Sequence, residues 1–148
     1  MMATMTAIDD MYIAATPARA FATIAAYNGM NDWFPEYQCQ IIDADSISEG
    51  CLVRHRVGKK RALSQFIRRI DRIEDGQRLE ESYIEGDLLG TGVWTFTAEG
   101  DGCRVAYDCT VTANTFGAKL GIWLTGAKLH NKFYQNLLTH LKAHLENA

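Results

Sequence analysis

The stretch EGDLLGTGVWTFTAEGDGCRVAYDCTV, residues 85–111, decides the fold. Two runs within it, GVWTFTA and CRVAYDCTV, flank the turn sequence Glu99-Gly100-Asp101-Gly102, which predicts a hairpin. Both runs alternate apolar and polar residues, so that Trp94 and Phe96 share one face of their strand. A sheet with a single apolar face needs another element to cover it.

The glycines of this stretch raise a second interpretation, a phosphate-binding loop. Such loops present a helix N-terminus directly after the glycines, and the spacing of Gly86, Gly90 and Gly92 matches neither the dinucleotide fingerprint nor the P-loop. An alternating strand follows instead, and glycines inside a strand mark bulges, bends or close backbone approach. We therefore predict that they shape the sheet, and we expect no nucleotide or other cofactor.

Upstream, β-runs separated by turn residues extend the pattern over about residues 36–113. Gly58-Lys59-Lys60 and the segment 74–77 are further turn sequences, and consecutive hairpins predict an antiparallel meander. Residues 5–13 predict a first strand. Thr16-Pro17 then supplies a capping hydroxyl and a proline at the first position of a short helix.

The element that covers the sheet lies at the C-terminus. Apolar residues recur there at spacings of three and four over about thirty residues, which predicts one stripe along a long helix. The stripe is Phe116, Leu120, Trp123, Ala127, His130, Tyr134, Leu137, Leu141 and Leu145. Gly121 and Gly126 each weaken the first half by about 1 kcal/mol relative to alanine. We expect a break near Thr125-Gly126 and a firm helix only after it.

This order of elements resembles the helix-grip fold of the START-related SRPBCC superfamily, which includes the birch-pollen-allergen fold. Residues 13–35, IAATPARAFATIAAYNGMNDWFP, are similar to the opening of that superfamily, and residues 85–111 to the hairpin of its polyketide cyclase/dehydrase and lipid-transport branch. The resemblance implies an α+β fold: a curved antiparallel sheet of about seven strands, with two short helices after strand one, around the C-terminal helix. It also implies an apolar cavity, by analogy of fold.

The first functional hypothesis is a protein that binds or transports an apolar small molecule: a lipid, a quinone, a sterol-like molecule or an aromatic polyketide. A few polar groups converging on an apolar cavity orient such a ligand. We expect Trp33 and Phe34 at or near the mouth of the cavity. The expected lining is Tyr83, Trp94, Phe96, Tyr107, Trp123, Ala127, His130 and Tyr134.

The second hypothesis is an enzyme of the cyclase or dehydratase type. Acid–base catalysis needs only a histidine or carboxylate beside the substrate, and the candidates are His130, His55 and Glu81. His130 falls on the apolar stripe, where a buried structural histidine is the alternative interpretation. The phase of residues 62–85 is open from the sequence, and with it the face on which Glu81 and Tyr83 lie.

Residues 54–72 hold eight of the fifteen lysines and arginines. We interpret this basic segment as the solvated face and tip of a hairpin. It lacks the interleaved aromatics of single-strand platforms, and the net charge is −3, so we expect no nucleic-acid partner. A third hypothesis is a transient membrane contact through this hairpin.

The remaining patterns concern metal binding, the cysteines, the number of domains and localisation. His140 and His144 are four residues apart, but the glutamate of H-E-x-x-H is missing, so we expect no metal. The four cysteines form no C-x-x-C pair and predict free thiols. The length fits a single domain over residues 1–148, as a monomer or homodimer, and the absence of a signal peptide or apolar span predicts a cytoplasmic protein.

Overall fold

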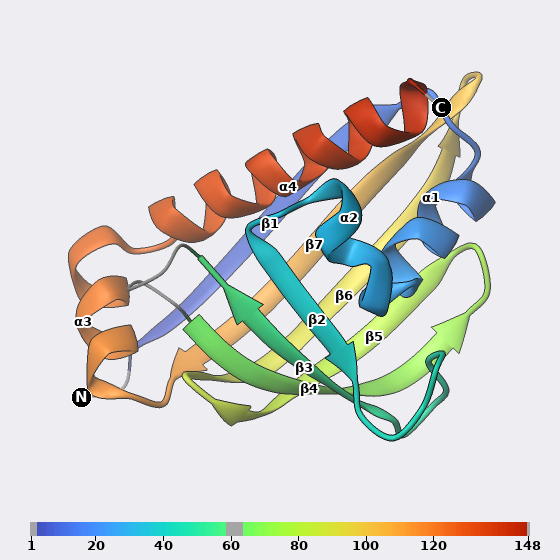
Figure 1. The fold of residues 1–148 in the computed structure, drawn as a ribbon. Coiled ribbons are helices and arrows are strands. Elements are labelled where there is room, and N and C mark those ends of the chain that lie inside the picture. The colour runs from blue at the N-terminus through green and yellow to red at the C-terminus, as the bar shows by residue number, and fades with distance from the viewer. Residues whose placement is uncertain (1–2, 59–63, 148) are drawn as a thin grey trace.

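The computed structural model describes residues 3–58 and 64–147. Seven strands form one antiparallel sheet in the order β1-β7-β6-β5-β4-β3-β2, which curls beneath a long C-terminal helix (Figure 1). This arrangement is the predicted helix-grip fold. The strands are β1 (Thr4–Ile13), β2 (Tyr37–Ile41), β3 (Leu52–Val57), β4 (Ser64–Glu74), β5 (Arg78–Gly86), β6 (Leu88–Glu99) and β7 (Gly102–Ala113).

The helices occupy two places in the chain. After β1 come α1 (Pro17–Ala25), the 3-10 turn η1 (Tyr27–Gly29) and α2 (Met30–Trp33), and after β7 come α3 (Phe116–Thr125) and α4 (Lys128–Glu146). The predicted cap of α1 is confirmed, because the Thr16 hydroxyl accepts a hydrogen bond from the Arg19 amide at 3.2 Å. In Figure 1, α3 and α1 lie at opposite ends of the molecule, and α4 runs between them across the sheet.

Hairpin connections build most of the sheet, as the turn sequences predict. The turns at 74–77 and 99–102 join β4 to β5 and β6 to β7. The third turn, at Gly58-Lys59-Lys60, falls between β3 and β4, which pair from Leu52–Arg69 to Val57–Ser64; residues 59–63 lie outside the described residues. Because β1 pairs with β7, the first and last strands lie side by side.

The core lies between the concave face of the sheet and the helices α1 and α4. Leu137, Leu138 and Leu141 of α4 are fully buried against it. Phe21 of α1 meets Phe96 of β6 edge to face, with ring centroids 5.4 Å apart. All four cysteines are free, as expected.

The glycines of residues 86–92 permit close approach between strands, as predicted. A Cβ on Gly90 would lie 2.1 Å from the Thr110 carbonyl oxygen of β7, and the φ of Gly90 is +146°. A Cβ on Gly92 would lie 2.0 Å from the Tyr107 hydroxyl oxygen. Gly92 therefore leaves the space that the Tyr107 side chain occupies above the sheet.

The predicted break in the C-terminal helix is confirmed, but the single stripe is wrong in its first half. Gly126, with φ +57°, separates α3 from α4. No residue of α3 is buried, and Phe116 and Trp123 are among its exposed side chains. Because the chain changes direction at Gly126, the spacing that faces inward along α4 does not continue along α3.

Candidate functional site

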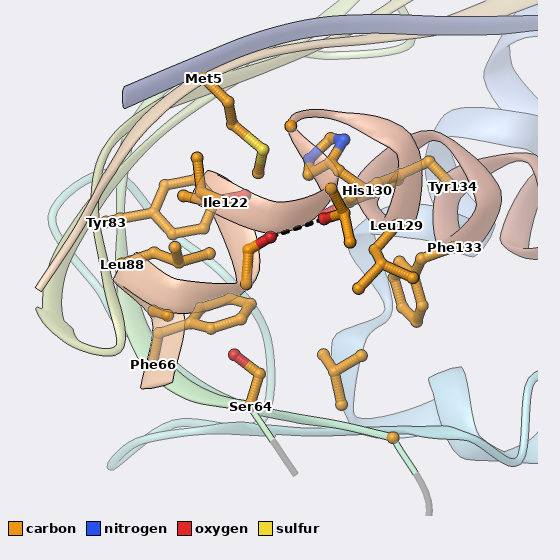
Figure 2. A pocket seen from close by; sticks show the side chains of 16 residues that line it. Met5, Ser64, Phe66, Tyr83, Leu88, Ile122, Leu129, His130, Phe133 and Tyr134 are labelled. Carbon is orange, nitrogen blue, oxygen red and sulfur yellow. Dashed lines mark hydrogen bonds between the residues drawn. The ribbon is translucent and has the colours of Figure 1, made fainter. Parts of the chain in front are cut away.

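A cavity of about 280 Å³ lies between α3, the start of α4 and the neighbouring strands (Figure 2). From the sheet side it is lined by Met5 of β1, Phe66 of β4, Tyr83 of β5 and Leu88 of β6. From the helices, Ile122, Leu129, His130, Phe133 and Tyr134 close around it. Its wall is therefore mostly apolar, and the polar exceptions are the side chains of two tyrosines, one histidine, Ser64 and Thr125.

A buried arginine anchors the polar groups beside this cavity. Arg68 of β4 lies on the same strand face as Phe66 and Ile70, and only 1% of it is exposed. Its Nη1 donates to Glu81 Oε2 at 2.9 Å, an ion pair in which both side chains are fully enclosed. Removing either partner would leave an unpaired buried charge, which makes the pair costly to break.

The same guanidinium holds two tyrosine hydroxyls of the cavity wall. Arg68 Nη2 donates to Tyr83 Oη at 2.6 Å and to Tyr134 Oη at 2.8 Å. Tyr83 Oη in turn lies 2.6 Å from Tyr107 Oη. Because a guanidinium can only donate, each hydroxyl that accepts from Arg68 keeps its own proton to donate elsewhere. The wall thus carries hydroxyl donors that a permanent positive charge polarises.

The ionisation of Glu81 follows from this burial. Loss of solvent raises the pKa of the Glu81 carboxyl well above its ordinary range. The charged partner of this carboxyl is Arg68, whose Nη1 lies 2.9 Å from Oε2 and which keeps its proton at any physiological pH. Glu81 serves as the counter-ion of Arg68, and it is not among the residues that line the cavity.

His130 is the one catalytic candidate that lines the cavity. Within residues 3–58 and 64–147, both of its ring nitrogens are buried without a hydrogen-bond partner. Burial lowers the pKa of His130 to about 4, and the charge of Arg68 adds to the effect, so the ring is neutral at pH 7. Its Nδ1 lies 3.7 Å from Oδ2 of the buried Asp9, which is longer than a hydrogen bond.

His55, the other histidine candidate, lies behind the cavity wall. Its Nδ1 is 2.7 Å from the Tyr37 hydroxyl, and its ring stacks on Phe66 at 5.1 Å. Burial lowers the pKa of His55 well below its ordinary value, and Arg68 adds to this shift. Phe66 therefore stands between His55 and the ligand space, which makes His55 a core histidine. Among the described residues its Nε2 has no hydrogen-bond partner.

Of the ten residues expected to bind ligand, Tyr83, His130 and Tyr134 line the cavity. Trp94 and Tyr107 pack behind Tyr134, with ring centroids 6.0 Å and 4.6 Å from it. The structure also settles the phase of β5, because Glu81 and Tyr83 are both buried.

The other expected lining residues lie elsewhere. Trp33 stacks on His144 and Phe34 packs on His140, both on α4, while Phe96 packs on α1. Ala127 sits at the start of α4 outside the lining, and Trp123 is 67% exposed on α3. The expectation for Trp123 rested on the single stripe, and the change of direction at Gly126 removes it.

Arg68 and Asp9 are the residues that the sequence analysis missed. Arg68 was assigned to a solvated hairpin face, yet it alternates with Phe66 and Ile70, and that period of two places it inward. This pattern could have found it. Asp9 alternates in the same way with Ala7 and Met11, which places it inward on β1. Its closeness to His130 has no such pattern, since His130 is 121 positions away along the chain and only the fold brings them together.

The described residues give no sign of a metal centre or membrane span. They contain no group of three or more histidine, cysteine, aspartate or glutamate side chains that could hold a metal ion. Within the same ranges, no helix is both long and apolar enough to cross a bilayer.

Comparison with known proteins shows the family to which the sequence belongs. A family described as polyketide cyclase / dehydrase and lipid transport matches residues 5–146. Among solved structures, TTHA0849 from Thermus thermophilus is 19% identical, with 97% of each chain covered and a TM-score of 0.76. No curated protein sequence matches this chain.

Two further solved structures share the fold. Ara h 8.0201 is 14% identical, with 98% of this chain and 99% of that chain covered and a TM-score of 0.68. A truncated norcoclaurine synthase from Thalictrum flavum is 8% identical, with 96% and 93% covered and a TM-score of 0.71. At such identities these likenesses concern the fold alone.

Proposed function

This chain belongs to the polyketide cyclase/dehydrase and lipid-transport family, and from that premise we propose that it binds a small apolar molecule carrying an oxygen acceptor. The observation that supports this is the apolar cavity whose wall includes Tyr83 and Tyr134, both held by the buried Arg68. An apolar body would fill the cavity, and its oxygen would accept from a tyrosine hydroxyl.

The cavity volume narrows the class of ligand. About 280 Å³ equals the liquid volume of roughly nine water molecules at ~30 Å³ each. A bicyclic aromatic ketone, a quinone ring or a short acyl chain has about that size. Among the ligand classes that the sequence suggested, this volume favours the small aromatic or quinone-like ones over a whole sterol or a long-chain lipid.

A matched pair of probes tests this proposal. We expect isothermal titration calorimetry to show saturable binding of 1-tetralone, and weaker binding of tetralin, which has the same bicyclic frame without the carbonyl. Tyr134→Phe removes one hydroxyl and should weaken 1-tetralone binding by roughly three- to tenfold, the loss of one hydrogen bond, while tetralin binding stays unchanged. Tyr12→Phe, on β1 outside the cavity lining, is the control. The proposal would be contradicted if neither 1-tetralone nor tetralin showed saturable binding.

A second candidate function is proton transfer on such a ketone, and the position of His130 favours it. A neutral ring with unpaired nitrogens lines the cavity, and its centroid lies 4.5 Å from that of Tyr134. In this reaction His130 takes a proton from the carbon beside the carbonyl, and the enolate oxygen accepts from Tyr134, which Arg68 polarises. Return of a proton to the carbon completes the exchange.

Hydrogen exchange on the same probe distinguishes binding from catalysis. In deuterium oxide, proton NMR follows the loss of the hydrogens next to the 1-tetralone carbonyl. An enzyme should accelerate this loss, and His130→Asn should remove the acceleration while 1-tetralone still binds. If wild type exchanges no faster than buffer, or His130→Asn exchanges like wild type, His130 is not the base and the protein is a carrier or sensor.

A further inference from the structure

The helix α3 is apolar on two opposite sides. Its inner side, with Ala118 and Ile122, lines the cavity. Its outer side carries Phe116, Leu120, Trp123 and Leu124, and Leu129 at the start of α4 joins them. These five residues, which we call the outer apolar face, are between 43% and 81% exposed. A helix that is apolar all round is normally enclosed on every side.

The outer apolar face is unusual within this molecule. Two other large apolar side chains of the described residues, Ile8 and Ile84, are also exposed, but they lie on separate strands, β1 and β5. On the outer face, five such side chains fall within fourteen consecutive positions, 116–129. Scattered exposed apolar residues need no explanation, whereas a gathered set indicates a surface that meets something.

The charged residues that neighbour this face along the chain are all positive. Residues 109–145 contain no aspartate or glutamate, although the whole chain has a net charge of −3. Lys119, Lys128 and Lys132, in and directly after α3, are all exposed. Lys119 lies three residues after Phe116 and four before Trp123, a spacing that places it beside them on the helix. Within α3 and the first turns of α4, the charged groups beside these bulky apolar side chains are therefore lysines alone. From another part of the chain, Glu36 lies beside Leu129 and Lys132 at one end of the face.

We propose that the outer apolar face docks on an anionic membrane surface. Tryptophan, phenylalanine and leucine on one side of a helix, with lysines at its border, suit the boundary between headgroups and acyl chains. The lysines meet the negative potential of anionic headgroups while the apolar side chains enter the boundary. A second copy of the chain suits the face less well, because a twofold contact through it would bring like-charged lysines together.

Docking of this kind has a consequence for the cavity. Leu129 belongs both to the outer apolar face and to the cavity lining, so the two are continuous at that residue. Figure 1 shows α3 at one end of the molecule, clear of the far end where α1 lies. The docked protein thus presents the cavity end to the bilayer, and an apolar ligand passes between them without crossing bulk water.

Vesicle binding tests this proposal without any ligand, so its outcome is independent of the proposed function. The probes are vesicles of phosphatidylcholine alone and of phosphatidylcholine mixed with phosphatidylglycerol. We expect co-sedimentation with the mixed vesicles, weaker co-sedimentation with phosphatidylcholine, and loss of binding as salt rises. Because Trp33 and Trp94 are buried, a blue shift of tryptophan emission on binding reports on Trp123.

Three variants locate the contact. Trp123→Ser combined with Leu124→Ser should abolish co-sedimentation, and Lys119→Glu combined with Lys128→Glu should reduce it on mixed vesicles by at least about tenfold. Ile8→Ser, which removes an exposed apolar side chain on β1, is the matched control and should bind like wild type. Circular dichroism verifies that each variant is folded.

Three results would overturn the proposal. The first is absence of binding to the mixed vesicles together with an unchanged Trp123 emission. The second is binding by the Trp123/Leu124 variant equal to that of wild type. The third is a concentration-dependent dimer in light scattering that the Trp123/Leu124 variant loses, without vesicle binding by wild type. That result would assign the outer apolar face to a second copy of the chain.

Discussion

The helices α3 and α4 follow each other along the chain with the same spacing of apolar residues, yet they use it in opposite ways. In α4 the apolar residues face the sheet, and Tyr134, Leu137, Leu138, Leu141 and Leu145 are buried. In α3 no residue is buried, and the largest apolar side chains face outward. Burial in the core therefore falls to α4, while α3 lines the cavity with one side and exposes the other.

The largest expected effect is the difference in stability between a leucine substitution in α4 and one in α3. Leu141→Ala in α4 should lower the free energy of unfolding by about 2–5 kcal/mol, because it leaves a cavity in a fully buried site. Leu124→Ala in α3, at a site 66% exposed, should change it by no more than about 0.5 kcal/mol. Urea denaturation followed by circular dichroism measures both, and equal losses would refute the division of roles.

The second effect concerns His130, which α4 holds in the cavity wall. Burial keeps its pKa at about 4 in the folded protein, against 6.5 unfolded. The unfolded state therefore binds the extra proton between these values, and stability falls as the pH falls from about 6.5 to about 4, by the order of 3 kcal/mol at most. His55, whose pKa is also lowered, contributes in the same direction.

The variant His130→Asn shows how much of this pH dependence of stability comes from His130. Its free energy of unfolding should fall less steeply than that of wild type over the same acidic window, and His55 should account for part of the slope that remains. Urea titrations at a series of pH values provide the measurement. Identical slopes for the two proteins would mean that His130 is protonated in the folded state and that its ring is accessible to water.

The third effect tests the break between the helices. Gly126 has φ +57° and ψ −131°, a conformation that costs a residue with a Cβ about 1–3 kcal/mol. Gly126→Ala should therefore lower the thermal midpoint, or else straighten the chain and turn Trp123 inward. The emission of Trp123 distinguishes the two responses. A variant with unchanged stability and emission would show that the break does not depend on glycine.

The smallest effect is expected at Gly117 of α3, and Gly92, beneath α4, provides the contrast. A Cβ on Gly117 would meet nothing within 4 Å, so Gly117→Ala should raise the free energy of unfolding by up to about 1 kcal/mol. A Cβ on Gly92 would overlap Tyr107, so Gly92→Ala should lower it by about 1–3 kcal/mol. Thermal denaturation compares them, and a gain from both substitutions would contradict the packing described here for Tyr107.

The fold could be predicted because its determinants are local. The turn at 99–102, the alternation around Trp94 and the glycine break at 126 each act within a few residues, and each is found where expected. The orientation of α3 could not be predicted in the same way. It depends on the direction that the chain takes after Gly126, and a pattern of spacing carries no information about that direction.

The residues of the site also differ in whether a local sequence pattern predicts them. Tyr134 and His130 could be predicted from the sequence because they belong to the apolar stripe of α4, which the structure confirms. The inward orientation of Arg68 could be predicted from its alternation with Phe66 and Ile70, but the many charged residues around it masked the pattern. The closeness of Asp9 to His130 brings together β1 and α4, and no local pattern predicts it.

We propose that a small apolar molecule binds between α3 and the sheet, and methyl NMR with added 1-tetralone tests this binding. Met5, Leu88, Ile122 and Leu129 place methyl groups in the cavity wall. We predict saturable shifts and intermolecular NOEs at these methyls, with none at the enclosed Leu141 and Leu145 of α4. Saturable contacts confined to other methyls, or no contact at all, would contradict the account.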